Sequence, residues 1–130
     1  EYSTEEKLEW SHQKKLKASR LFVKKQYDEA IHFYKEALTS MDYADENEVP
    51  LELRLRFINE IKIPIFLNLA ACLNEKRDYE TALKYCEEAI KFNPNHCKAY
   101  YRRGICHHHL DNDAKALEDL KKSLDLCKDE

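Results

Sequence analysis

The chain has 130 residues and a formal net charge of −3. This length predicts one domain, residues 1–130, that buries about two-thirds of the surface of its unfolded chain. With one glycine and three prolines, the composition favours long helices and excludes a sheet-rich protein. The charge excludes a general nucleic-acid binder, which would carry a basic excess.

No apolar run approaches the roughly 18 residues that cross a bilayer, and no leader precedes the first helix. We therefore expect a soluble cytoplasmic protein with no membrane partner, and the nucleus as a second location.

Six helices are predicted in chain order. Their expected bounds are Glu5 to Lys24, Tyr27 to Tyr43, Pro50 to Lys76, Tyr79 to Phe92, His96 to Leu110 and Asp113 to Lys128. Pro64 lies inside the third helix, where it lacks an N–H and crowds the preceding turn. We expect a kink near Asn59 to Ile63, with a separate short helix as the alternative.

The helices carry an internal repeat. Small or apolar residues follow a first small residue at +12, +16 and +19 in three places: Ala18 with Ala30, Tyr34 and Ala37; Ala70 with Ala82, Cys86 and Ala89; Gly104 with Ala116, Leu120 and Ser123. The last two copies are 34 residues apart, which is the tetratricopeptide period, and the first two are 52 apart. The pattern predicts an all-α fold of three tandem helix-turn-helix repeats that form a short right-handed superhelical solenoid. The repeats span about 11–44, 63–96 and 97–130, with an 18-residue insertion at about 45–62. The alanines at +12 should be buried where helices cross.

The five cysteines are an odd number, which argues against a disulfide framework. Cys72, Cys86 and Cys106 fall on apolar helix faces and are predicted to be reduced core thiols.

The histidine run 107–109 lies near His96, Cys97 and Cys106, and imidazole and thiolate are zinc ligands. However, consecutive helical side chains point about 100° apart, so the run cannot converge on one ion. We expect no metal and no cofactor. No nucleophile stands at a motif spacing from a histidine and an acid, so no catalytic residue is assigned and a non-enzyme is expected.

The opening Tyr2-Ser-Thr-Glu-Glu-Lys-Leu-Glu9, three repeats and an insertion after the first resemble the C-terminal domain of FKBP-type large immunophilins, which are co-chaperone peptidyl-prolyl isomerases. The most specific segments are Phe66-Leu-Asn-Leu-Ala-Ala-Cys72 and Lys98-Ala-Tyr-Tyr-Arg-Arg-Gly104. The resemblance covers essentially the whole chain. It implies that isomerase chemistry would belong to a separate domain of a longer parent, and a start at Glu1 without Met agrees with such a segment.

In that family a carboxylate clamp holds the C-terminal Glu-Glu-Val-Asp of a heat-shock chaperone. By register, the resemblance places the clamp on Lys15, Asn68, Lys98 and Arg102. The fifth position, commonly asparagine, is Ser19, whose hydroxyl has a shorter reach. The implied partner is the tail of a chaperone of the 90 kDa class, which is favoured, or of the 70 kDa class.

The residue chemistry fits an acidic peptide independently. Lys98 and Arg102 are four residues apart and share a helix face, as do Lys15 and Ser19. Cationic donors make strong charge-assisted bonds to carboxylates. Glu75, in a position where the family often has a basic residue, would repel such a peptide if it faces the groove. A plain solvated face is the alternative for any single cation, and the set of four favours a clamp.

A scaffold that binds another protein through its concave surface or insertion is the alternative function. At the last helix, Leu117, Leu120 and Leu124 are expected to lie partly uncovered. A seventh helix in the parent, or self-association, would cover them.

Overall fold

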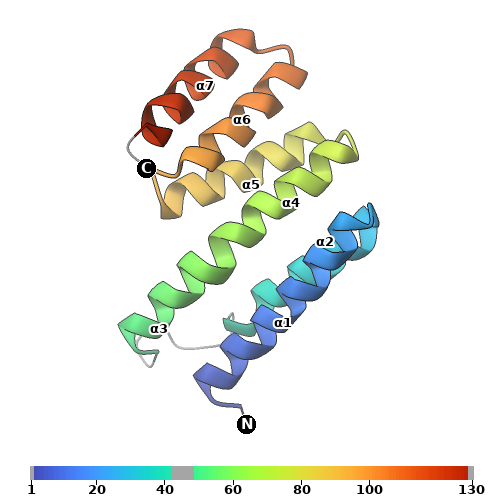
Figure 1. The fold of residues 1–130 in the computed structure, drawn as a ribbon, viewed down its shortest axis with the longest axis vertical. Helices are drawn as coiled ribbons and strands as arrows, with labels where there is room; N and C mark the ends of the chain where they lie inside the picture. The colour runs from blue at the N-terminus through green and yellow to red at the C-terminus, as the bar shows by residue number, and fades with distance from the viewer. Residues whose placement is uncertain (1, 42–48, 129–130) are drawn as a thin grey trace. The chain divides into compact units, whose positions relative to one another are not determined.

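The computed structural model describes residues 2–41 and 49–128, and within them it contains helices and no strand (Figure 1). The elements are α1 Thr4–Val23, α2 Tyr27–Leu38, η1 Thr39–Met41, α3 Leu51–Arg56, η2 Phe57–Lys62, α4 Ile63–Glu75, α5 Tyr79–Phe92, α6 Cys97–His109 and α7 Asp113–Cys127. The predicted all-helical fold is confirmed. The second helix ends earlier than predicted, and its expected end, Tyr43, lies outside the described residues.

The turn between the paired helices has the same backbone in all three repeats. Lys25, Arg77 and Asp111 adopt left-handed conformations, with φ of 63°, 64° and 60°. The next N–H of each turn donates back into the helix at 2.8 to 2.9 Å: Gln26 to Leu21, Asp78 to Leu73 and Asn112 to His107. These residues are spaced 52 and 34 apart, as the repeat pattern requires. Each first helix therefore ends in a Schellman motif at the same repeat position.

Side-chain caps begin several of the helices. Ser3 opens α1 with a capping box, in which its hydroxyl accepts from the Glu6 N–H at 3.2 Å and the Glu6 carboxylate accepts from the Ser3 N–H. Asp78 and Asn112 accept from the N–H groups three residues ahead, at the starts of α5 and α7. These caps satisfy amide donors that a helix start leaves unpaired.

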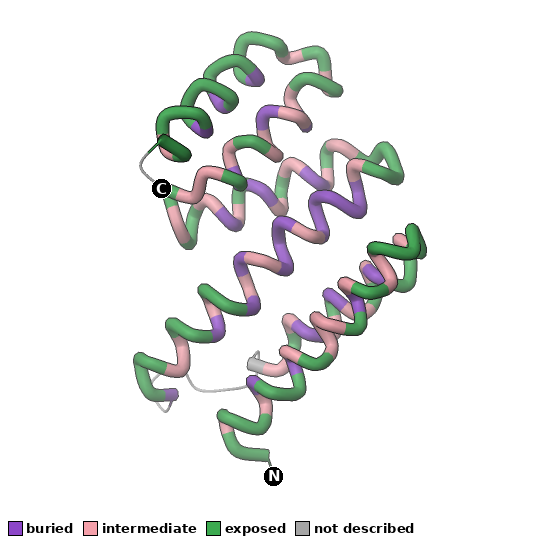
Figure 2. The backbone as a smooth tube through the Cα atoms, in the orientation of Figure 1, coloured by how far each residue is buried: buried purple, intermediate pink, exposed green. Residues whose placement is uncertain are grey.

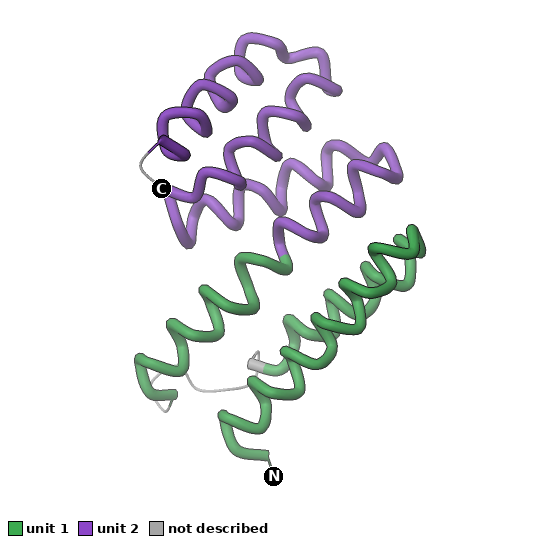
Figure 3. Tube along the Cα trace, viewed as in Figure 1, with its two compact units in different colours: residues 1–65 green, residues 66–130 purple. Residues whose placement is uncertain are grey.

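The chain forms two compact units, residues 1–65 and residues 66–130 (Figure 3). In the first, α1 packs on α2, and η2 contacts both. In the second, α6 packs on α5 and on α7. The predicted small positions are buried, with Ala30 and Ala82 at 0% exposure and Ala116 at 4% (Figure 2).

Gly104 lets α6 and α7 approach closely. A Cβ at this position would lie 3.1 Å from the Leu120 side chain and 3.3 Å from the Ala116 carbonyl oxygen. Leu120 itself is 38% exposed, whereas its repeat equivalents Tyr34 and Cys86 are buried. Leu117 and Leu124 are also exposed, which confirms the partly uncovered leucine face predicted for the last helix.

The third predicted helix is a continuous stretch, Leu51–Glu75, made of α3, η2 and α4. The disturbance predicted before Pro64 takes the form of the π-helical turn η2, in which the Ile63 N–H bonds to the Ile58 carbonyl. Single π turns inside α-helices are rare and coincide with local bends of the helix. The alternative of a separate short helix is not what these residues form.

This stretch also corrects an expectation about membranes. The sequence was predicted to hold no segment long and apolar enough to cross a bilayer, yet Leu51–Glu75 meets that criterion by length and composition. Of its most apolar window, 61% is buried inside the structure. The core helix of a soluble protein has the same composition, so the stretch is weak evidence for a membrane span.

Candidate peptide-binding site

Lys15, the predicted clamp lysine of α1, is held by the backbone of η2. Its ammonium donates to the carbonyl oxygen of Glu60 at 2.9 Å. Burial lowers the pKa of Lys15, and the nearby Glu60 carboxylate partly offsets that effect. An ammonium has three N–H donors, so this contact leaves two for other acceptors.

Ser19 lies one turn further along α1 and faces the partner helix of its repeat. Its hydroxyl oxygen is 2.9 Å from the hydroxyl oxygen of Tyr34, a residue that is 1% exposed. One member of the pair donates and the other accepts. The Ser19 hydroxyl therefore already makes one hydrogen bond inside unit 1.

Asn68, Lys98 and Arg102 belong to the second unit. Lys98 is exposed, and Asn68 and Arg102 are half-buried. Within the described part of the chain, none of the three makes a side-chain hydrogen bond or an ion pair, and the buried Nε of Arg102 has no acceptor. A half-buried guanidinium without an acceptor is costly unless a ligand supplies one.

Arg103, the next residue on α6, is ion-paired within the described part of the fold, in contrast to Arg102. Its guanidinium donates to both carboxylate oxygens of Asp119 on α7, at 2.8 Å each. The carboxylate is 8% exposed, and the bond to it raises the pKa of Arg103. The two neighbouring arginines therefore differ sharply: one ties α6 to α7, and the other has its charge available.

The positive charge of Arg102 acts to lower the pKa of two thiols on neighbouring helices. Burial raises the pKa of the Cys72 thiol on α4 to about 11, and Arg102 opposes that rise while Glu75 adds to it. A hydrogen bond to Cys106 and burial raise the pKa of Cys86 on α5, and Arg102 opposes this rise too. Asn68, Cys72 and Glu75 follow an i, i+4, i+7 spacing along one face of α4. Arg102 and Glu75 therefore both act on the Asn68 face of that helix.

The three histidines of the run 107–109 have separate neighbours. His107 lies 3.7 Å from the Asp119 carboxylate, the His108 ring nitrogen is 3.1 Å from the Asp113 carboxylate, and His109 stacks on Tyr79 with ring centroids 4.3 Å apart. Among the described residues, no group of three or more His, Cys, Asp or Glu could hold a metal ion.

Cys72, Cys86 and Cys106 are free and buried, as predicted. The expectation that the odd cysteine count argues against disulfides is wrong for one pair, because the structure contains a disulfide between Cys97 and Cys127. Their separation of 30 residues follows no disulfide motif, and only the antiparallel packing of α6 and α7 brings the two together.

Comparison with known proteins agrees with this architecture. Residues 69–130 match the sequence profile of the tetratricopeptide-repeat family. All of the chain aligns with 85% of the C-terminal TPR-containing domain of a Plasmodium falciparum FK506-binding protein, at 31% identity and a TM-score of 0.88. The chain belongs to the tetratricopeptide-repeat family. A tetratricopeptide-repeat domain is a protein-interaction fold, so the chain is an interaction module.

Two further similarities bear on context. The aryl-hydrocarbon-interacting protein-like 1 of Bos taurus is 32% identical over 108 residues, which are 83% of this chain and 33% of that protein. The first TPR domain of Spaghetti (RPAP3), solved with the HSP90 peptide SRMEEVD bound, is 25% identical with a TM-score of 0.70, over 89% of this chain and 78% of that one. The chain spans 28% to 33% of the length of the aryl-hydrocarbon-interacting protein-like 1 relatives that it matches, and 22% of a yeast peptidyl-prolyl cis-trans isomerase.

Proposed function

We propose that this domain binds the C-terminal Glu-Glu-Val-Asp tail of a heat-shock chaperone through a carboxylate clamp, with the 90 kDa class favoured over the 70 kDa class. The clamp residues are Lys15, Ser19, Asn68, Lys98 and Arg102. The observation that carries the proposal is the half-buried Arg102 guanidinium, whose buried Nε has no acceptor among the described residues. A carboxylate is the ligand that such a group binds most strongly, because it can accept two parallel N–H bonds.

The five side chains would have different roles. Arg102 would bind a carboxylate in a bidentate manner, and Lys98, one turn earlier on α6, would add a point charge. The Asn68 amide would donate without a charge. Lys15 would offer the N–H donors that the Glu60 carbonyl does not use. Ser19 would contribute least, because its hydroxyl is shared with Tyr34.

The comparisons support this partner class. The Spaghetti domain was solved with a peptide that ends in Glu-Glu-Val-Asp, and its fold matches most of this chain. The similarity to an FK506-binding protein supports a second part of the proposal. We place the domain in a longer co-chaperone of the FKBP type, in the cytoplasm and also the nucleus, whose isomerase would be a separate domain.

The decisive test compares a Glu-Glu-Val-Asp peptide having a free C-terminal carboxylate with the same peptide amidated. Calorimetry should give micromolar affinity for the acid, about −8 kcal/mol, and little binding of the amide. Arg102→Ala should weaken the acid peptide about tenfold, about 1.4 kcal/mol, with little effect on the amide. Lys121→Ala, which removes an exposed cation on α7, is the matched control and should leave both affinities unchanged. Equal affinities for acid and amide would contradict the clamp and favour a scaffold that uses another surface.

A further inference from the structure

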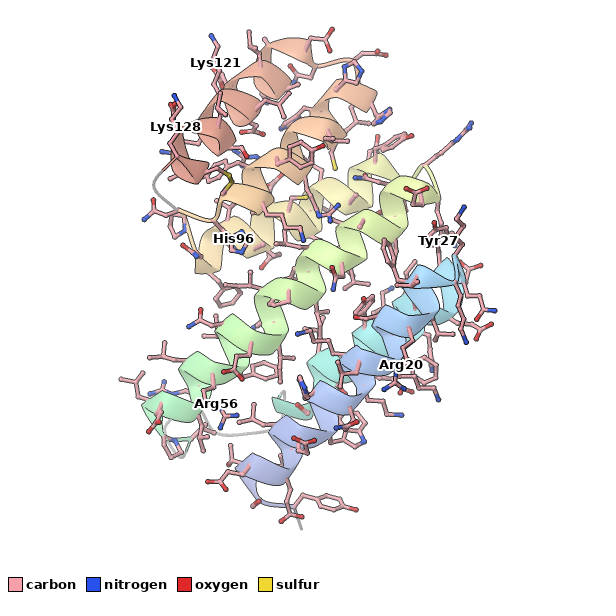
Figure 4. The ribbon with its side chains drawn as sticks, in the orientation of Figure 1. Arg20, Tyr27, Arg56, His96, Lys121 and Lys128 are labelled. Atoms are coloured by element: carbon pink, nitrogen blue, oxygen red, sulfur yellow. A yellow bond between two sulfur atoms is a disulfide. The ribbon has the colours of Figure 1, made fainter. Side chains whose placement is uncertain are left out.

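The disulfide between Cys97 and Cys127 joins the two ends of an antiparallel helix pair. Cys97 is the first residue of α6 and Cys127 is the last residue of α7, with their Cα atoms 5.6 Å apart. This Cα separation lies within the range that disulfides span. Figure 4 draws the bond in yellow. The crosslink therefore joins α6 and α7 at the end opposite their connecting turn.

Accessibility separates this pair from the other three cysteines. Cys72, Cys86 and Cys106 are each 0% exposed. Cys127 is exposed and Cys97 is half-buried. Buried thiols in apolar surroundings react poorly, because both thiolate formation and reagent access are disfavoured. A thiol reagent of moderate size would therefore reach the terminal pair and leave the core thiols unchanged.

The two sulfur atoms are held near each other by contacts that do not involve sulfur. The Ser123 hydroxyl on α7 donates to the Cys97 carbonyl oxygen at 2.9 Å. Further along the pair, Arg103 and Asp119 form their two-bond ion pair. These contacts fix the register of α7 on α6 in the reduced protein too, so the disulfide can open and close without a search for its partner.

We propose that Cys97 and Cys127 form a thiol–disulfide exchange site, a reversible modification site that reacts with low-molecular-weight disulfides of the glutathione class. The Cys127 thiolate attacks one sulfur of oxidised glutathione, which releases one glutathione thiolate and leaves a mixed disulfide on Cys127. The Cys97 thiolate then attacks the Cys127 sulfur and releases the second glutathione. Two protein thiols are oxidised, one glutathione disulfide is reduced to two thiols, and the two thiol protons pass to them.

The surroundings of Cys97 suit the second step. As the first residue of α6, Cys97 lies where free backbone amides and the helix dipole stabilise an anion. Lys98 follows it directly and adds a positive charge. A thiolate in that position is the nucleophile that resolves the mixed disulfide on its neighbour.

Oxidation would act on a helix that has an uncovered apolar face. The outer face of α7 exposes Leu117 and Leu124. A helix whose outer face is uncovered has fewer packing contacts to oppose local unfolding. The disulfide ties the far end of α7 to the start of α6, so the oxidised protein should resist fraying of its last repeat.

The test equilibrates the intact chain in buffers with a graded ratio of reduced to oxidised glutathione, followed by acid quench, alkylation and mass spectrometry. Cys97 and Cys127 should convert together between alkylated and disulfide forms with one midpoint. The melting temperature should be higher in the oxidised form by about 5–10 °C. The double variant Cys97→Ser/Cys127→Ser should melt at the same temperature in every buffer.

Single variants distinguish an exchange site from a fixed crosslink. Cys97→Ser should accumulate a glutathione adduct on Cys127, because nothing resolves the mixed disulfide, while Cys127→Ser should accumulate far less. A pair that stays oxidised in excess reduced glutathione, or stays reduced in oxidised glutathione, would overturn the proposal. So would conversion of Cys72, Cys86 or Cys106 at the same midpoint.

Discussion

The Lys15 ammonium donates to the Glu60 carbonyl oxygen, and Glu60 stands four residues before Pro64. In an α-helix, the N–H of residue 64 would be the donor to that carbonyl, and proline has none. The lysine of α1 is the side-chain donor to this carbonyl, next to the π turn that precedes Pro64. A helix irregularity in one part of unit 1 thus orients a candidate binding residue in another part of the same unit.

Pro64→Ala should weaken the hold on Lys15, because alanine allows a regular α-helical turn in which the residue-64 N–H competes for the Glu60 carbonyl. We expect the affinity for the acid peptide to fall a few-fold, and Lys15→Ala to lower it about tenfold, which is about 1.4 kcal/mol. In the Lys15→Ala background, Pro64→Ala should have no further effect, since the two changes act through one ammonium. Calorimetry on the four proteins measures this coupling. An equal loss from Pro64→Ala in both backgrounds would mean that proline acts only through helix structure.

The Arg103–Asp119 ion pair should contribute strongly to stability. Asp119→Asn removes the charge that compensates a partly buried guanidinium, and we expect a loss of about 2 kcal/mol in the free energy of unfolding by urea. Asp125→Asn is the matched control on the same helix. Asp125 pairs with Lys128 at 3.9 Å, and both side chains are more than two-thirds exposed, so its loss should cost about 0.5 kcal/mol or less. Similar losses for both variants would contradict the structural role of Asp119.

The repeat offsets predicted the helices well because each small residue in the pattern reports a close helix crossing, and such crossings tolerate few alternatives. Ala82 and Cys86 are fully buried where the offsets place them. The turns were harder to predict. Lys25 and Arg77 hold left-handed conformations that glycine usually occupies, so composition gave no sign of them. The backbone hydrogen bonds of the Schellman motif hold those angles.

Arg77→Gly should therefore stabilise the domain. A side chain at φ of 64° costs about 1–2 kcal/mol, whereas glycine adopts this conformation freely and loses only part of the gain through its greater unfolded-state entropy. The expected net gain is about 0.5–1 kcal/mol in urea unfolding. Lys84→Gly, an exposed position inside α5, should lose about 1 kcal/mol. Destabilisation by Arg77→Gly would show that the arginine side chain itself supports the turn.

The candidate site was less predictable than the fold. The repeat register assigns each residue a position on a helix, but it does not show which groups that side chain will contact. The resemblance assigns Lys15 and Ser19 to the clamp, but nothing in the sequence indicates that Lys15 donates to a backbone carbonyl and that Ser19 shares a hydrogen bond with a tyrosine. Arg102 and Arg103 are adjacent and chemically identical, and only the structure shows that Arg103 is ion-paired while Arg102 has no ion pair among the described residues. A useful sequence signal did exist at Pro64, since an internal helical proline always leaves one carbonyl without its usual donor.

Glu75 should weaken binding of an acidic peptide, and Glu75→Gln should strengthen it. Glu75 raises the pKa of the Cys72 thiol and Arg102 lowers it, so both charges lie near that thiol. Glu75 also lies on the face of α4 that carries Asn68. A carboxylate in that position repels an anionic ligand over about 10 Å at 0.1 M salt. We expect the acid peptide to bind about two- to threefold more tightly to Glu75→Gln at low salt, with a smaller gain at high salt.

Glu118→Gln, an exposed carboxylate on α7, is the control for the change in net charge. It should leave the affinity nearly unchanged, because the effect of a screened charge depends on its distance from the ligand. Calorimetry with the acid peptide at two salt concentrations measures both variants. Equal gains in affinity from Glu75→Gln and Glu118→Gln would show that only the net charge of the domain matters. No gain from either variant would show that Glu75 lies too far from the bound peptide to affect its affinity. A gain confined to Glu75→Gln would locate the peptide on the α4 and α6 side of unit 2, where the Arg102 Nε has no acceptor among the described residues.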